Sequence, residues 1–167
     1  MRNSVSEALL DSFQRNNTIL LNLLRALPEG GLEARAMEGS PSVGEQFAHI
    51  QNTRLFWLQQ VAPEFAEGLL PLFYQDPDDR SAEGIEPAFE ESARAICKAV
   101  KHRLEAGQPM EGAHARYDHP VLFLQHMLWH EGYHVGQIKL ALKRTGYVMP
   151  EVLEEQAIWS LWRTEVW

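Results

Sequence analysis

Three histidines, His126, His130 and His134, follow one another at intervals of four residues in the C-terminal half of the sequence. In a helix, a step of four residues turns by about 40° and rises by about 6 Å, so the three imidazoles would form a slanted row on one face. Two neighbouring imidazoles in such a row can bind one divalent metal ion. The outer two lie about 12 Å apart along the axis, too far to share an ion with ligand distances of about 2 Å.

The spacing leaves open which pair would bind. His130 can pair with either His126 or His134, and a further ligand has to come from another helix. His49 is the best-placed candidate, because it lies midway along another amphipathic segment. A packed or hydrogen-bonded histidine is the alternative for each of them. We expect a packed or surface role for the remaining ones: His102, His114 and His119.

The elements that position these residues are predicted to be helices. Leu and Ala together are twice as frequent as Val, Ile and Thr together, which favours helix over strand. Apolar residues recur at helical spacing in five segments: about 6–27, 42–63, 87–104, 120–144 and 150–167. Ser42 and Glu45 form a capping-box pair. We therefore predict an all-α fold, a four-helix bundle with a short C-terminal helix, in a single domain spanning residues 1–167.

A long connection, residues 61–84, separates the second and third predicted helices. It contains Pro63, Pro71 and Pro77, but its apolar residues 69–74 are unusual for a free linker. A connection of this length within a compact domain is often functional. We expect a packed crossover, and a wall or lid over a site is the alternative.

Composition excludes several classes of function. The formal net charge is -8 and no dense cluster of Lys and Arg occurs, which argues against a nucleic-acid partner. No apolar run approaches the roughly 20 residues of a membrane span, and the N-terminus does not resemble a signal peptide. The single cysteine, Cys97, excludes an internal disulfide and suits the cytoplasm. Its place on an apolar stripe predicts a small core residue.

Two segments resemble the DinB/YfiT family of bacterial proteins: SVGEQFAHI at residues 42–50 and HEGYHVGQI at residues 130–138. The family is a metal-binding four-helix bundle that pairs an early histidine with a late H-x-x-x-H followed by G-Q. The resemblance implies that His49, His130 and His134 are the metal ligands. It leaves His126 one turn away, as a supporting or substrate-facing group.

Three neutral imidazoles leave a position of a divalent ion open, as in catalytic sites. Zinc and nickel both suit imidazole ligands. The resemblance implies a small-molecule substrate and one of two chemistries. These are metal-dependent hydrolysis and transfer with a low-molecular-weight thiol, and we favour the second. Glu131 and His126 are the candidate catalytic groups. For Glu131, the alternative interpretation is a solvated or helix-paired carboxylate, which is the commoner role at such a position.

Two alternatives remain. One is a metal-binding or ligand-binding stress-response protein without turnover, and the other is a bundle whose histidines are core groups. The C-terminal aromatic residues would pack the last helix onto the bundle or form a dimer surface: Trp159, Trp162 and Trp167. The resemblance favours a homodimer.

Overall fold

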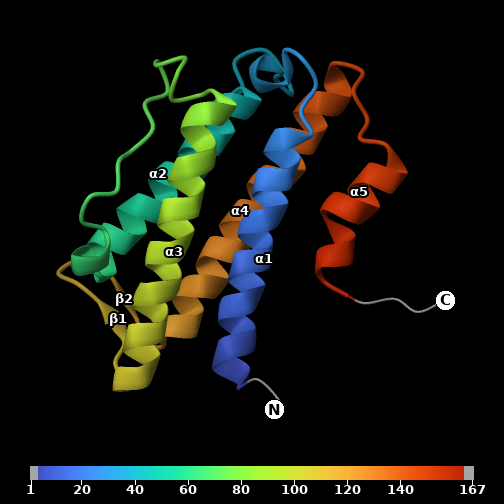
Figure 1. Cartoon of the computed structure of the whole chain (residues 1–167). Helices are drawn as coiled ribbons and strands as arrows, with labels where there is room; N and C mark the ends of the chain where they lie inside the picture. The colour runs from blue at the N-terminus through green and yellow to red at the C-terminus, as the bar shows by residue number, and fades with distance from the viewer. Residues whose placement is uncertain (1–3, 164–167) are drawn as a thin grey trace.

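The computed structural model describes residues 4–163. Four long helices form a bundle, and a short fifth helix follows (Figure 1). Their bounds are α1 Val5–Arg25, α2 Val43–Val61, α3 Ala82–Ala106, α4 Pro120–Arg144 and α5 Glu151–Ala157. Single-turn 3₁₀ helices occupy Gly31–Glu33, Pro63–Phe65 and Trp159–Leu161. The predicted all-α bundle with a long connection between its second and third helices is confirmed.

Local sequence explains where the first two long helices begin. The hydroxyl of Ser42 accepts a hydrogen bond from the backbone N–H of Glu45, and the Glu45 carboxylate accepts one from the backbone N–H of Ser42. This is the predicted capping box, and Ser4 and Glu7 form the same arrangement ahead of α1. Each box satisfies backbone donors that the helix itself leaves without partners.

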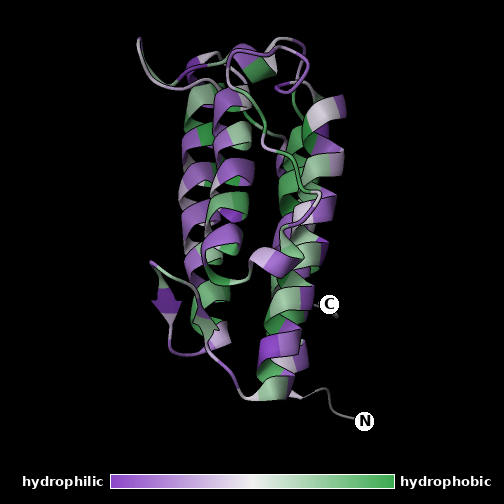
Figure 2. Ribbon diagram, turned by 90° about the vertical axis from the view of Figure 1, so that its left-hand side faces the viewer, coloured by the Kyte–Doolittle hydropathy of each residue, from purple (hydrophilic) through white to green (hydrophobic). Residues whose placement is uncertain are grey.

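The helices pack so that α1 and α2 occupy opposite corners of the bundle. Each of them contacts both α3 and α4. Figure 2 shows hydrophilic and hydrophobic residues alternating along each long helix, as expected for helices that bury one face. The short α5 contacts α1, on the side away from the hairpin (Figure 1).

The core consists of two apolar clusters with polar residues between them. One cluster includes Phe47 and Ile138, and the other includes Phe13 and Phe123. In each long helix, buried polar residues separate the residues of one cluster from those of the other along the sequence. We call these residues the polar layer: Asn16 and Asn17 of α1, Gln51 and Arg54 of α2, Ser92 of α3 and Glu131 of α4. Of the three clustered histidines described below, His130 and His134 fall in this stretch of α4, whereas His49 lies in α2 between Ala48 and Ile50 of the first cluster.

The third helix begins earlier than the sequence pattern predicts. We expected it from about Pro87, but it starts at Ala82 and continues through the proline. The Ser81 hydroxyl caps it by accepting from the backbone N–H of Gly84, and buried Ile85 anchors its first turns. Gly84 is required here, because a Cβ would lie 2.4 Å from the carbonyl oxygen of Asp78.

A short hairpin between α3 and α4 was not predicted. Strand β1, Met110–Glu111, pairs antiparallel with β2, Arg116–Tyr117. Strands of two residues are too short for an alternating pattern to reveal them. Gly112 follows β1 where a Cβ would lie 1.7 Å from the Gln60 carbonyl oxygen, so the hairpin packs closely against the end of α2.

The C-terminal segment also differs from the prediction. The expected single helix towards Trp167 ends at Ala157, and Ile158 breaks the helical backbone before the last 3₁₀ turn. Ile158 is the buried contact, while Trp159 and Trp162 are 47% and 43% exposed. Trp167 lies outside the described residues. Within residues 4–163, no helix has the length and apolar character that crossing a membrane requires.

Candidate metal centre

Helices α2 and α4 bring three of the histidines together. His49 comes from α2, and His130 and His134 come from successive turns of α4. Potential ligand atoms of the three lie within 4.8 Å of one another. Their ring centroids are separated by 4.6 to 5.2 Å. The structure therefore groups the residues named by the family resemblance, and a metal ion could be held between them.

The spacing of the ring nitrogens fits a metal ion. The Nε2 atoms of His49 and His130 are 3.3 Å apart. Two imidazole nitrogens at 2.0–2.1 Å from a tetrahedral ion would lie about 3.3 Å from each other. Without an ion, one of these two nitrogens has to donate a proton to the other. Between two unprotonated nitrogens, a cation satisfies both lone pairs at once.

Neighbouring side chains at His49 and His134 are compatible with the tautomer that a metal needs. His49 Nδ1 lies 3.3 Å from the Tyr74 hydroxyl, and His134 Nδ1 lies 3.4 Å from Oε1 of the buried Gln46. A hydrogen bond donated from Nδ1 leaves the Nε2 lone pair available for coordination. The Nδ1 of His130 is buried and has no hydrogen-bond partner among the described residues.

Burial keeps the imidazoles neutral. Burial is the main cause, and together with the nearby histidines it lowers the pKa of both His130 and His134 to about 4. Burial also lowers the pKa of His49. At neutral pH, all three imidazoles are therefore unprotonated, which is the state that binds metal ions.

His126 is separated from this group. It lies one turn before His130, and its Nδ1 is 2.7 Å from the Tyr117 hydroxyl of β2. Its ring packs edge-on against Trp57. These contacts make His126 an aromatic-packed histidine that ties α4 to the hairpin. Of the remaining histidines, His102 packs near Phe65, His119 caps α4, and His114 is exposed in the turn of the hairpin.

Glu131 is not the solvated carboxylate that its position suggested. It is fully buried and forms a two-pronged ion pair with Arg54, with N–O distances of 2.6 and 2.9 Å. Asn16 donates to the same carboxylate. Arg54 also donates to Asn17, and its guanidinium lies over Phe89. In all of these contacts, the Glu131 carboxylate accepts hydrogen bonds from buried side chains.

A cleft of about 500 Å³ opens beside the histidines. His49, His134 and Gln46 form part of its wall, and Tyr74 and Gln75 of the long connection form another part. The remaining lining residues come from the start of α2 and the loop before it: Arg35, Gly39, Pro41 and Glu45. The cleft is in the size range of small-molecule sites.

The connection is both packed and part of the site. Leu72 is buried, and its backbone N–H and C=O bond to the side chain of Asn52 at 2.8 and 2.7 Å. This clamp to α2 fixes the residues just before Tyr74. The expected packed crossover and its alternative, a wall over a site, therefore describe the same segment.

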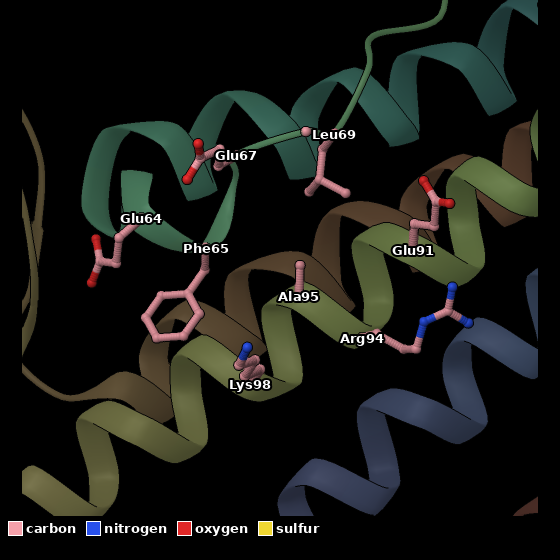
Figure 3. A pocket seen from close by; sticks show the side chains of 9 residues that line it. Glu64, Phe65, Glu67, Leu69, Glu91, Arg94, Ala95 and Lys98 are labelled. Carbon is pink, nitrogen blue, oxygen red and sulfur yellow. The ribbon is translucent and has the colours of Figure 1, made fainter.

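A second hollow, of about 550 Å³, lies between the connection and α3 (Figure 3). Acidic and basic side chains line it, including Glu67, Glu91, Arg94 and Lys98. None of the clustered histidines reaches it. We therefore place the candidate chemistry in the cleft that the histidines line.

Sequence reasoning did not single out Arg35, Gln46 or Tyr74 as parts of the site. Gln46 had a signal, because it precedes His49 by three residues and shares its helix face. Arg35 and Tyr74 lie in irregular segments, where spacing carries no such information.

Cys97, expected in the core, is half-buried beside one apolar cluster. Its burial raises the thiol pKa to about 11, so it is a poor nucleophile.

The comparisons with known proteins agree with this picture. The model of the DinB family matches residues 1–163, nearly the whole chain. No curated protein and no solved structure matches it.

Proposed function

This chain belongs to the DinB family, and on that premise we propose that it is a metalloenzyme in which His49, His130 and His134 bind one divalent metal ion. The observation that carries the proposal is the grouping of three neutral imidazoles whose nitrogens face one another beside an open cleft. Zinc and nickel are the metals we expect, because both suit imidazole ligands.

A divalent ion held this way supplies Lewis acidity, which lowers the pKa of a water or thiol bound to it. The surrounding residues bind and orient. Gln46 can accept a hydrogen bond from Nδ1 of His134, and the Tyr74 hydroxyl can accept one from Nδ1 of His49, which leaves each Nε2 for the metal. The cleft admits a small molecule from solvent. We favour transfer with a low-molecular-weight thiol over hydrolysis.

We do not propose Glu131 as a general base. Its carboxylate is occupied by Arg54 and Asn16 and is fully buried. A general base has to come within hydrogen-bond reach of a substrate proton. We instead assign Glu131 to holding α4 in register with the other long helices. His126 has a supporting role through Tyr117.

Metal content tests the site directly. Mass spectrometry of the purified protein, after incubation with zinc or nickel, should give about one ion per chain. His49→Ala, His130→Ala and His134→Ala should each lose it, whereas His126→Ala and His102→Ala should retain it. A wild-type protein that takes up neither metal would contradict the proposal.

Turnover tests the chemistry. The metal-loaded protein should consume an electrophilic small molecule only when a low-molecular-weight thiol is present. Turnover with water alone would indicate the hydrolase. Stoichiometric metal without turnover across both panels would favour the non-catalytic binding protein instead.

We also propose a homodimer, in the cytoplasm, formed through the solvent-facing side of α4. Trp129 and Tyr133 are 76% and 54% exposed there. Gly132 and Gly136 lie in the same helix, with open space where a Cβ would be. In an antiparallel α4 pair, one register would place Trp129 against Gly136 and Tyr133 against Gly132 of a second copy. Sedimentation analysis of wild type and Trp129→Ala tests this, and a monomeric wild type would refute it.

A further inference from the structure

Arg35 is the one residue with a permanently positive side chain among those that line the cleft beside the histidines. Its position is fixed by the backbone, because Arg35 pairs with Ser42 in an antiparallel bridge just where Ser42 caps α2. Its guanidinium contacts the Glu45 carboxylate at 2.8 Å. Glu45 and His49 are neighbours at i and i+4 on one helix face, about 6 Å apart along the axis. The guanidinium is therefore held about one helical turn from the histidine cluster.

The hydrogen bonds of this pair leave a surplus of donors. A guanidinium carries five N–H groups. Nη1 of Arg35 donates to Glu45 and to the carbonyl oxygen of Ser40. The same oxygen of Glu45 also accepts from the Ser42 backbone N–H. Among the described residues, no partner is found for Nε or Nη2 of Arg35, and its side chain is 40% exposed.

The charges of the surroundings point the same way. The carboxylate of Glu45 is engaged by the helix cap, whereas the arginine still has free donors arranged as a planar fork. Such a fork matches the two oxygens of a carboxylate. The start of α2, which also borders the cleft through Pro41 and Gln46, adds the partial positive charge of a helix N-terminus.

We propose that the small molecule acted on in this cleft carries a carboxylate, which Arg35 binds while the reacting group lies at the three histidines. This inference rests on the proposed function, because it takes the histidine cluster as the reacting end. It defines the substrate class as short organic acids whose reacting group lies a few bonds from the carboxylate. Tyr74, which also lines the cleft, can donate a further hydrogen bond to such an acid.

Matched thiols test this on the cobalt(II)-loaded protein, whose visible absorbance reports thiolate binding. The probes are 3-mercaptopropionate and the uncharged 3-mercapto-1-propanol, which differ mainly in the carboxylate. We expect the acid to bind about tenfold to a hundredfold more tightly, as for a hydrogen bond to a charged group. Arg35→Gln should abolish this preference without changing the affinity for the alcohol. Arg35→Lys should retain part of it.

Arg94→Gln is the matched control, because it removes the same charge from the other hollow (Figure 3). It should leave the preference for the acid intact. Equal affinities for acid and alcohol in the wild type would overturn the inference, and so would a preference that survives Arg35→Gln.

A second arm does not depend on the metal. In the metal-free, ¹⁵N-labelled protein, millimolar propionate should shift the amide resonances of residues 39–46, and Arg35→Gln should remove the shifts. If the protein binds no cobalt but shows these shifts, the proposed function fails and the carboxylate site stands. If it binds cobalt and thiols but shows neither shifts nor a preference, only the carboxylate site fails.

Discussion

Replacing Glu131 with glutamine should destabilise the protein strongly, although the change preserves shape and volume. The carboxylate accepts two hydrogen bonds from Arg54 and one from Asn16, and both charged side chains are fully buried. In Glu131→Gln, an amide nitrogen has to face one of these donors, and the guanidinium keeps a buried charge without a counter-ion. Breaking a buried ion pair from one side costs about 3–5 kcal/mol.

The assays are urea unfolding, which gives the free energy, and thermal unfolding, which gives Tm, both followed by circular dichroism. For a chain of this length, each kcal/mol corresponds to about 2–4 °C in Tm, so Tm should fall by about 6–20 °C. Asp11→Asn is the control, because it breaks an ion pair with Arg15 in which both side chains are nearly half exposed. It should cost less than about 1 kcal/mol.

A double variant separates the pair from its environment. Arg54→Met combined with Glu131→Leu removes both charges and should recover most of the stability that Glu131→Gln loses, because apolar replacements of buried pairs are often neutral. A loss of less than about 1 kcal/mol in Glu131→Gln alone would refute the reasoning. It would mean that the pair is solvated in solution.

Three further outcomes follow from the site and from α4. Tyr74→Phe should weaken metal binding about tenfold to a hundredfold in a chelator competition, whereas Ala in place of the exposed Phe73 should not; equal affinities would show that the hydroxyl contact to His49 is dispensable. The pKa values of His130 and His134 are about 4 in the folded state and 6.5 in the ordinary state, so the unfolded chain takes up protons first as the pH falls. The unfolding free energy of the metal-free protein should therefore be complete above about pH 6.5 and decline towards pH 4, and a flat profile of urea midpoints would contradict this. In the Trp129→Ala background, which removes the proposed dimer contact, Gly136→Ala adds a methyl group in open space and should stabilise the monomer by about 0.5–1 kcal/mol; a destabilised monomer in urea unfolding would count against the open helix face.

The helices could be predicted because their signals are local. Apolar spacing and the Ser42–Glu45 capping box depend on residues within a few positions of one another, and the structure reproduces them. The start of α3 was misjudged because proline is a strong local signal, while the cap at Ser81 and the burial of Ile85 depend on packing. The hairpin had too few residues to show a period.

The candidate site, like the fold, was predictable only where its signals are local in the sequence. Spacing gave two possible pairs in the His126, His130 and His134 row and made His49 the best-placed further ligand, and only the resemblance selected His130 with His134. That these three lie together depends on how α2 packs against α4. Glu131 was misjudged because its partner, Arg54, lies 77 positions away in the sequence. Contacts at that separation leave no periodic trace in one sequence.

The polar layer also affects how substitutions in the two apolar clusters combine in their effects on stability. The two apolar clusters share no buried member, and the layer lies between them. Substitutions that are far apart and have no common partner usually add in their effects on stability. Changes at Phe47 and at Phe123 should therefore combine almost independently in their effects on stability. Such modularity would let either half of the bundle diversify, by natural drift or by engineering, while the polar layer between them is retained.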